Sequence, residues 1–388
     1  MSRPKTILVL HYFGLMPLAG VAMEAIHYVL GLRRLGYDAW YIEDNGANPY
    51  SPQQNSVVWD ASYNIGFIRS MMERFGMGDR WAYWDPTRPD SYHGLSREAL
   101  FRLYREADAL INLCGTTKLR EEHMACPVRI LVDTDPIFEQ IKLAQGDAAS
   151  AAYIDAHNVL YTIGENLGEA DCPVPLGERA WLKTRPPVIP DIWPVAIERE
   201  PPSFSTIATW QHSIKDIEFN GERYQWSKHG NFLKFLDLPN RTSQRFRLAM
   251  ITPNAGVNTL VAKSGWEVID PVPVSSSFDA YAGFIADSRG EFTVAKDIYV
   301  RGRSGWFSDR SVCYLASGRP VITQSTGFEK LTPTGRGLFA FTDWAEIFAA
   351  LEAIRGDYAG HCRAAREIAV EHFDSAKVLG RMMRHVGL

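Results

Sequence analysis

A proline-rich segment divides this 388-residue chain into two halves with the same kind of patterning. Six prolines fall within the 19 residues 184–202, and neither the period of a strand nor that of a helix continues through them. On both sides of this linker, short apolar runs alternate with helical patterns, which predicts doubly wound parallel sheets of the α/β class. Because about 100–200 residues make one domain, a chain of this length is expected to hold two.

The first half, residues 1–190, opens with a predicted β-α-β unit. Residues 6–10 (TILVL) are continuously apolar, as in a parallel strand that is buried on both faces. A helical pattern follows at residues 21–35, and residues 39–42 form the next predicted strand. Three further strands are predicted, at residues 109–113, 128–132 and 159–163.

The second half, residues 204–365, shows the same architecture without repeating the sequence. Five strands are predicted, at residues 205–209, 247–251, 266–269, 292–295 and 320–323. Two long helical stretches close the chain, at residues 344–355 and 358–385. Ligands of open α/β sheets bind beyond the carboxyl ends of the strands. Two such domains facing each other therefore predict a ligand-binding cleft between them.

Charge and cysteine content argue against several classes of protein. The net charge of −4 removes the electrostatic basis for coating nucleic acid, so no nucleic-acid partner is expected. Five cysteines, none in a C-x-x-C pair, indicate neither a disulfide framework nor a zinc site and favour a cytoplasmic protein. No stretch approaches the ~20 apolar residues of a transmembrane segment. The motifs of P-loop NTPases, dinucleotide dehydrogenases, serine hydrolases and zincins are absent.

The segment 301–320 (RGRSGWFSDRSVCYLASGRP) predicts an anion site where a loop becomes a helix. Ser308 or Asp309 is a natural N-cap, and the amides of the first helical turn carry the positive end of the helix dipole. Such an end binds phosphate, and arginine adds bidentate pairing. A capped amphipathic helix with solvated arginines remains the alternative. The candidate residues of this segment are Arg303, Ser304, Ser308, Asp309, Arg310 and Ser311.

The order of features in the second half resembles the C-terminal domain of GT-B glycosyltransferases. The stretch CYLASGRPVITQSTGF is similar to the helix-turn-strand signature of their retaining bacterial nucleotide-sugar group (the family 1, GT4-like enzymes), and its loop residues Ser325, Thr326 and Gly327 would face the donor. Lys228, in YQWSKHGNFLKFLDLP, resembles the diphosphate-binding lysine of that group. Residues 366–388 resemble the family's last helix, which crosses back onto the N-terminal domain.

The resemblance has one departure. The retaining group usually carries two glutamates about seven residues apart, and Cys313 occupies the position of the second. Asp309 lies one helical turn earlier on the same face and either contacts the ribose or serves only as a cap. Glu291 is a loose match for the first glutamate.

Two candidate catalytic residues lie in the first half. His11 follows the first strand, where a histidine can act as a general base toward an acceptor or can hydrogen-bond within a turn. Asp135 belongs to the D-x-D sequence 133–135 at the end of a strand; it is an acceptor-side carboxylate, a turn residue, or a metal ligand of the GT-A kind. The aromatic-rich segment 59–93 is either packing or an acceptor-binding region.

Taken together, the sequence and the resemblance predict a metal-independent glycosyltransferase. It would move a sugar from a nucleoside-diphosphate sugar to a small-molecule or glycan acceptor, with no cofactor. Lys228, with Arg303 or Arg310 and the helix amides, would stabilise the departing diphosphate, so no metal is expected. Two alternatives remain open: a GT-B-shaped binding or scaffold protein without activity, and a sugar-nucleotide epimerase of the same fold.

Overall fold

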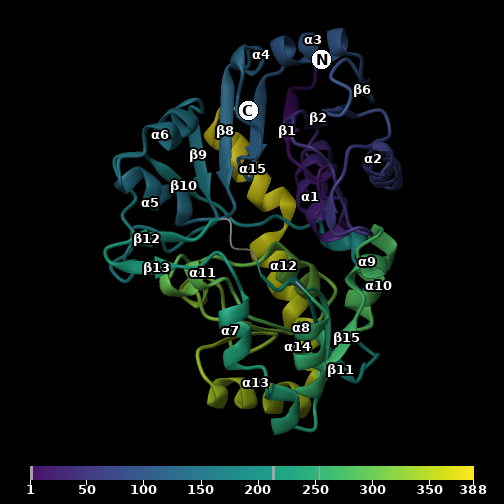
Figure 1. The fold of residues 1–388 in the computed structure, drawn as a ribbon, viewed down its shortest axis with the longest axis vertical. Coiled ribbons are helices and arrows are strands. Elements are labelled where there is room, and N and C mark those ends of the chain that lie inside the picture. Colours follow the sequence, from purple (N-terminus) through teal and green to yellow (C-terminus); the bar gives the residue numbers. More distant parts are fainter. Residues whose placement is uncertain (1–2, 212–214, 253) are drawn as a thin grey trace.

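The computed structural model describes residues 3–211, 215–252 and 254–388. It contains one large parallel sheet in each half of the chain, and Figure 1 shows the two domains stacked along the long axis of the molecule. The fold class expected from the sequence, two Rossmann-like α/β domains, is confirmed.

The N-terminal sheet has the strand order β10-β9-β8-β7-β1-β2-β5-β6, and only β6 runs antiparallel to its neighbour. The chain reverses its direction of growth between β1 and β7, which are adjacent, so this pair is the switch point where ligands of such sheets bind. The strands are β1 (Thr6–Leu10), β2 (Asp38–Glu43), β5 (Trp81–Trp84), β6 (Tyr92–His93), β7 (Ala109–Leu113), β8 (Val128–Asp133), β9 (Val159–Thr162) and β10 (Trp181–Lys183).

Helices and a small hairpin complete the N-terminal domain. The hairpin pairs β3 (Tyr50–Ser51) with β4 (Ser56–Val57). The helices are α1 (Ala19–Arg34), α2 (Ser62–Arg74), α3 (Arg97–Glu106), α4 (Glu121–Met124), α5 (Phe138–Ala144) and α6 (Ala148–Asp155). In the linker, a short 3₁₀ helix η1 (Pro190–Ile192) follows β10.

The C-terminal sheet has the strand order β15-β14-β11-β16-β17-β18, with its switch point between β11 and β16. Its strands are β11 (Ser203–Thr209), β14 (Arg245–Ile251), β15 (Glu267–Ile269), β16 (Glu291–Thr293), β17 (Val321–Gln324) and β18 (Leu338–Phe341). A separate hairpin pairs β12 (Ile217–Phe219) with β13 (Glu222–Tyr224). The helices are α7 (His229–Lys234), η2 (Leu238–Arg241), α8 (Ala255–Lys263), α9 (Pro271–Val274), α10 (Phe278–Ala286), α11 (Asp297–Arg301), α12 (Asp309–Ala316), η3 (Phe328–Lys330) and α13 (Trp344–Gly356).

The closing stretch 358–385 is three helical pieces where the sequence pattern predicted one. α14 (Tyr358–Ile368) runs into a π-helical turn η4 (Ala369–Phe373), and α15 (Ser375–His385) starts afresh after Asp374. The Asp374 carboxylate accepts a hydrogen bond from the Ala376 amide and so caps α15. α15 then packs along α1 of the N-terminal domain, as Figure 1 shows in yellow and purple.

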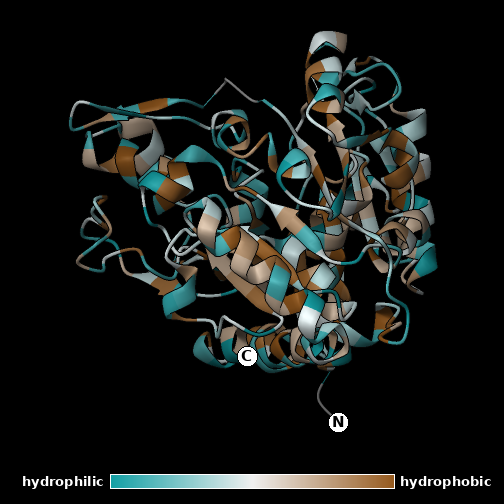
Figure 2. Ribbon diagram, turned by 90° about the horizontal axis from the view of Figure 1, so that it is seen from below, coloured by the Kyte–Doolittle hydropathy of each residue, from teal (hydrophilic) through white to brown (hydrophobic). Residues whose placement is uncertain are grey.

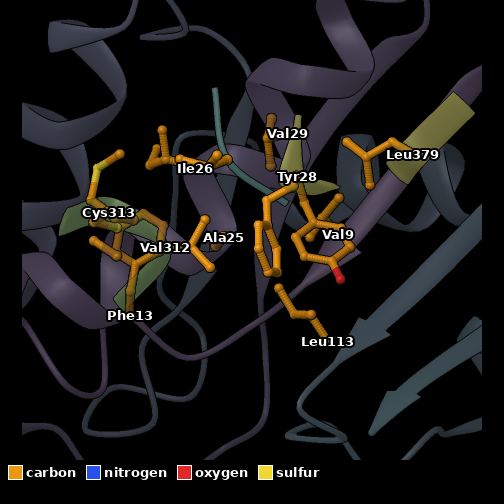
Figure 3. Close-up of a cluster of buried hydrophobic side chains, with 14 of the residues drawn as sticks. Val9, Phe13, Ala25, Ile26, Tyr28, Val29, Leu113, Val312, Cys313 and Leu379 are labelled. Atoms are coloured by element: carbon orange, nitrogen blue, oxygen red, sulfur yellow. The ribbon is translucent and has the colours of Figure 1, made fainter. Parts of the chain in front are cut away.

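The largest cluster of buried hydrophobic side chains runs through both domains. It joins Val9 and Phe13 of the N-terminal domain to Val312 on α12 and Leu379 on α15 (Figure 3). Figure 2 shows hydrophobic and hydrophilic residues alternating along the helices, as expected for helices that bury one face. The helix that carries the predicted anion site is therefore anchored in a core shared with the opposite domain.

Gly305, in the loop after α11, marks a close approach between the two domains. Its φ is +76°, and a Cβ added there would lie 2.5 Å from the backbone nitrogen of Asn166 in the N-terminal domain. The Asn166 amide in turn donates to the carbonyl of Ser304. Both the backbone conformation and the lack of space require glycine at this position.

Replacing Gly305 with alanine is expected to lower the free energy of unfolding by two additive effects. The left-handed backbone contributes about 1–2 kcal/mol, and the contact with Asn166 about 1–3 kcal/mol more. Gly221→Ala is the matched control, because Gly221 has φ +77° and no atom within 4 Å of an added Cβ. Urea denaturation measures both variants, and equal losses in the two would contradict the close approach.

Within the described part of the chain, no helix is both long and apolar enough to span a bilayer.

Candidate functional site

A cleft of about 280 Å³ lies between the two domains. It opens at the carboxyl ends of both sheets, as expected for doubly wound folds. The N-terminal wall includes residues of α1 and the segments after β1, β7 and β8, and the C-terminal wall includes the ends of β11 and β14 and the start of α12. The charged residues that line it are Glu24, Asp135, Lys228, Lys296, Asp309 and Arg310.

Lys228 lines the cleft just before α7 and has no carboxylate partner in the described part of the chain. Its Nζ lies 5.9 Å from the centre of the Trp306 ring. Desolvation in the cleft, and then repulsion from Arg310, lower the pKa of the Lys228 ammonium well below its ordinary value. An incoming anion in this position would favour the charged form of the Lys228 amine and pair with it.

The start of α12 forms the neighbouring part of the wall. Ser308 is the N-cap by its backbone angles, but its hydroxyl does not cap the helix. The first-turn amides are therefore not occupied by this side chain, and the positive end of the helix dipole faces the cleft lined by Ser308, Asp309 and Arg310. This geometry suits a phosphate group.

Arg310 is shared between the cleft and a buried carboxylate. Its Nε donates to Glu291 Oε1 at 2.6 Å and one terminal nitrogen donates to Thr293 Oγ1 at 3.0 Å. The Glu291 side chain is 0% exposed and the Arg310 side chain 12% exposed. Burial would lower the pKa of Arg310, but the charge and the hydrogen bond of Glu291, together with Tyr281 and Asp309, raise that pKa. Arg310 is thus a fixed cation, held in place before any ligand arrives.

Asp309 is a carboxyl group that titrates near neutrality. Burial first, and then repulsion from Glu24, raise the pKa of Asp309 to about 7, against the opposing pull of Arg310 and Lys228. Near pH 7 it therefore populates both the neutral form, which donates a hydrogen bond, and the charged form.

A salt bridge spans the cleft from Asp135 to Lys296. Lys296 Nζ lies 2.8 Å from Asp135 Oδ1 and 3.9 Å from the centre of the Trp226 ring, and the Tyr299 hydroxyl donates to the same carboxylate. Partial desolvation alone would raise the pKa of Asp135, but Lys296 and the hydrogen bonds lower it below its ordinary value. Asp135 is thus ionised, paired and fixed in the cleft wall.

Asp133, the other acidic residue of the D-x-D sequence, does not line the cleft. Asp133 is buried and accepts hydrogen bonds from Gln140 at 2.9 Å and Thr162 at 3.3 Å inside the N-terminal domain. Desolvation raises the pKa of Asp133 to about 7. Asp133 is held by Gln140 and Thr162 and Asp135 by Lys296 and Tyr299, so the two carboxylates are not arranged as the paired metal ligands of a GT-A site.

Several predicted donor residues do not line the cleft. Arg303 is paired with Asp171 at 2.6 Å, because its loop turns toward the N-terminal domain. The Ser325 hydroxyl donates to Glu329 at 2.6 Å, and the Thr326 hydroxyl donates to the Trp306 carbonyl at 2.6 Å. The remaining residues of this set are Ser304 and Ser311, both 0% exposed, and Gly327, which approaches Asn166.

His11 is fully buried and does not line the cleft. Tyr12 and Glu24 line the wall in its place. The prediction that His11 acts as a general base on an acceptor is therefore not supported, since the ring has no surface for an acceptor to reach. Its nearest charged neighbour is Glu24, with Nε2 and Oε2 3.5 Å apart.

Sequence reasoning missed Glu24, Lys296, Trp226 and Trp306, all of which line the cleft. Lys296 carried the clearest signal, since it follows a predicted strand at the edge where ligands bind. Glu24 lies on α1 within an amphipathic pattern that gave no sign of function. The two tryptophans lie in segments that were singled out for their charged and hydroxyl side chains.

No family model matches the sequence, and no curated protein matches it by sequence. Solved structures do match its shape. An alpha-glucosyltransferase in complex with UDP-glucose and DNA has a TM-score of 0.60 at 9% identity, over 99% of each chain. AviGT4, a glycosyltransferase involved in avilamycin A biosynthesis, has a TM-score of 0.53 at 12% identity, over 98% of this chain and 97% of its own. HepE of Anabaena, in complex with UDP, has a TM-score of 0.55 at 10% identity, over 99% of each chain.

At this level of identity the similarity concerns the fold. The similarity extends over nearly the whole of each chain, so it includes both domains. These neighbours are GT-B glycosyltransferases, the superfamily that residues 290–388 of the sequence resemble. This chain therefore has the GT-B fold, in which two Rossmann-like domains enclose a cleft.

Proposed function

We propose that the chain is a glycosyltransferase that transfers a sugar from a nucleoside-diphosphate sugar to an acceptor in the cleft. The observation that supports this most directly is Lys228, a desolvated ammonium without a carboxylate partner beside Arg310 and the open start of α12. These three groups face the same part of the cleft from the C-terminal wall.

The chemistry follows from where charge develops. As the bond between sugar and diphosphate breaks, the leaving group gains negative charge while the sugar carbon becomes electron-poor. Lys228, Arg310 and the helix amides bind the charged leaving group more strongly than the esterified donor, which lowers the barrier. Their positions are fixed by the fold, so no metal on the diphosphate is needed. Asp135 and Lys296, which also line the cleft, would orient the acceptor.

Uridine diphosphate is the nucleotide to test first. Two of the structural neighbours are complexes with UDP-glucose or UDP. Arg303, Ser304, Ser325, Thr326 and Gly327 are not part of the proposed diphosphate site, because they do not line the cleft.

A thermal-shift panel of UDP, GDP, TDP and their sugars tests the proposal. A ligand present at about 100 times its dissociation constant stabilises the folded state by about 2.7 kcal/mol, which raises the melting temperature measurably. We expect one nucleotide family to produce such a shift. If no nucleotide shifts melting at millimolar concentration, the proposed donor site is wrong.

A second candidate is a GT-B protein that binds a nucleotide sugar without transferring the sugar. It is favoured by Cys313, which stands 3% exposed at the position of the second glutamate of the retaining group. Incubation with the nucleotide sugar that shifts melting, followed by measurement of free nucleoside diphosphate, separates the two. Release of the diphosphate supports the transferase, and binding without release supports the binding protein.

A further inference from the structure

Three side chains of metal-binding type meet at the N-terminal wall of the cleft. They are His11, Glu24 and Cys114, and one ligand atom from each lies within 4.8 Å of the other two. His11 Nε2 is 3.5 Å from Glu24 Oε2, and Cys114 Sγ is 3.2 Å from Glu24 Oε1. In a tetrahedral zinc site with ordinary bond lengths, neighbouring ligand atoms lie about 3.4–3.6 Å apart. The group is therefore close to the spacing that a metal requires.

The topology of the sheet explains why these residues meet. His11 follows β1 and Cys114 follows β7, the adjacent strands at the switch point of the N-terminal sheet. Glu24 reaches the same point from α1, the helix that follows β1. Cys114 is held by an uncommon backbone with φ +58°, and its sulfur accepts a hydrogen bond from Thr134 at 2.9 Å. Glu24 and Cys114 both line the cleft.

His11 supplies an independent reason to expect a ligand. Its side chain is 0% exposed, yet neither ring nitrogen has a hydrogen-bond partner in the described part of the chain. A buried polar group without a partner lowers stability by about 1–3 kcal/mol, so such groups are rare and call for an explanation. A metal ion bound at Nε2 provides the missing partner.

The charge of the cleft also favours a cation here. The described lining residues include three carboxyl groups and three basic groups, so the wall is close to balanced before a donor enters. A nucleoside diphosphate adds at least two negative charges. A divalent cation beside Glu24, on the wall opposite Lys228 and Arg310, compensates for that addition.

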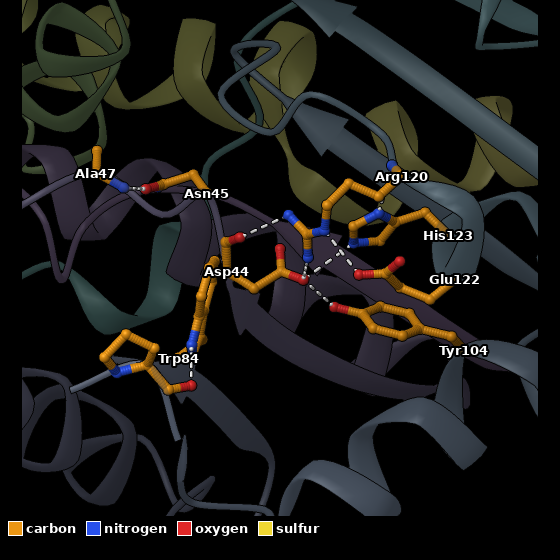
Figure 4. Close-up of polar contacts among 9 residues, drawn as sticks. Asp44, Asn45, Ala47, Trp84, Tyr104, Arg120, Glu122 and His123 are labelled. Carbon is orange, nitrogen blue, oxygen red and sulfur yellow. Dashed lines mark hydrogen bonds and ion pairs between the residues drawn. The ribbon is translucent and has the colours of Figure 1, made fainter. Parts of the chain in front are cut away.

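A second group of metal-binding residue types has contacts that leave no position for a metal ion (Figure 4). Asp44, Glu122 and His123 also lie together. However, Arg120 lies between the two carboxylates, at 2.5 Å from Asp44 Oδ2 and 2.6 Å from Glu122 Oε1. The Tyr104 hydroxyl donates to Asp44 at 2.7 Å. A guanidinium already neutralises this cluster, so it has no place for a cation.

We propose that His11, Glu24 and Cys114 bind one divalent transition-metal ion of the zinc class, with a fourth position open to the cleft. One imidazole nitrogen, one carboxylate oxygen and one thiolate form a ligand set that such ions favour over Mg²⁺ or Ca²⁺. On binding, the Cys114 thiol loses its proton to solvent and the sulfur–metal bond forms. The open position takes a water or a hydroxyl group from a molecule in the cleft and lowers its pKa.

The test uses Co²⁺ as a spectroscopic probe for the full-length protein after removal of bound metal with a chelator. We expect one equivalent of Co²⁺ to produce a thiolate-to-cobalt charge-transfer band, which added Zn²⁺ then displaces. Cys114→Ser should remove the band and weaken binding by more than about 100-fold, because losing only an outer-shell partner already weakens metal sites 10- to 100-fold. Glu24→Gln should weaken binding similarly while the thiolate band persists at high Co²⁺.

Cys126→Ser is the matched control. Cys126 is a buried thiol of the same domain that donates to the carbonyl of Val128 at 3.5 Å, far from the cleft lining. This variant should keep both the band and the stoichiometry. Absence of the band in the wild-type protein, or its persistence in Cys114→Ser, overturns the proposal. The nucleotide shift reports on the opposite wall, so the metal site and the proposed donor site can fail independently.

Discussion

Replacing Arg310 with alanine is expected to lower the free energy of unfolding by about 3–5 kcal/mol, in addition to removing a donor contact. The variant leaves Glu291, which is 0% exposed, without the cation that neutralises it. Removing one partner of a buried ion pair has a large effect because the other charge stays buried and unpaired. Glu291 Oε2 already lacks a hydrogen-bond partner among the described residues, so the variant leaves this carboxylate without its ion-pair partner as well. Urea denaturation at neutral pH measures the loss.

The double variant Arg310→Ala/Glu291→Gln should recover most of the lost stability, because a neutral amide replaces the stranded carboxylate. Arg303→Ala is the control, since Arg303 is 39% exposed and its pair with Asp171 is expected to contribute only about 0–1 kcal/mol. If Arg310→Ala is as stable as Arg303→Ala, the prediction that the buried Arg310–Glu291 pair stabilises the fold is contradicted. Loss of turnover in Arg310→Ala alone is consequently an ambiguous result, because unfolding produces it too.

Replacing Lys228 with methionine is expected to weaken nucleotide binding about 30-fold or more without weakening the fold. The ammonium has no carboxylate partner among the described residues and is desolvated, so its removal leaves no stranded charge and relieves an unfavourable burial. In the complex, the same ammonium is paired with the diphosphate. Truncating one side of such a buried charge pair weakens binding by about 2–5 kcal/mol, which is about 30-fold or more. Isothermal titration with the nucleotide found in the panel measures the affinity.

Lys330→Met is the control for the same chemical change outside the cleft. Lys330 is 42% exposed and pairs with Asp171 at the domain junction. Its variant should bind nucleotide like the wild-type protein. The proposal for Lys228 is contradicted if Lys228→Met binds nucleotide as tightly as Lys330→Met does. It is also contradicted if Lys228→Met unfolds at clearly lower urea, because the residue would then be part of the scaffold.

Much of the fold could be predicted from local sequence. The predicted strand at residues 6–10 coincides with β1, and the one at residues 109–113 coincides with β7, because fully buried parallel strands are continuous apolar runs. The aromatic-rich segment 59–93 was harder. It contains β5 and β6, where Tyr83 pairs with His93 at the sheet edge. Strand pairing at an edge depends on a distant neighbour, and local pattern does not report it.

In the candidate site too, residues with a local sequence signal could be predicted, and residues placed by a distant partner could not. Lys228, Ser308, Asp309 and Arg310 were found because each lies in a short segment with its own chemical signature, and all four line the cleft. The position of Arg303, five residues before Ser308, depends on Asp171, a partner from the other domain. No local pattern encodes such a pairing.

The same reason explains why the proposed metal ligands escaped detection. His11, Glu24 and Cys114 are 13 and 90 residues apart along the chain and meet only because β1 and β7 are adjacent. Zinc motifs are recognised by short, regular spacings, and this group has none.

The burial of Cys313 limits which side chains this position of α12 can hold. Its thiol donates to the Asp309 carbonyl, and its side chain is part of the core that α12 shares with the N-terminal domain (Figure 3). A glutamate restored there would push a carboxylate into apolar packing next to Glu291. The packing therefore disfavours an acid at position 313, and Asp309, one helical turn earlier, is the acidic side chain of α12 that lines the cleft.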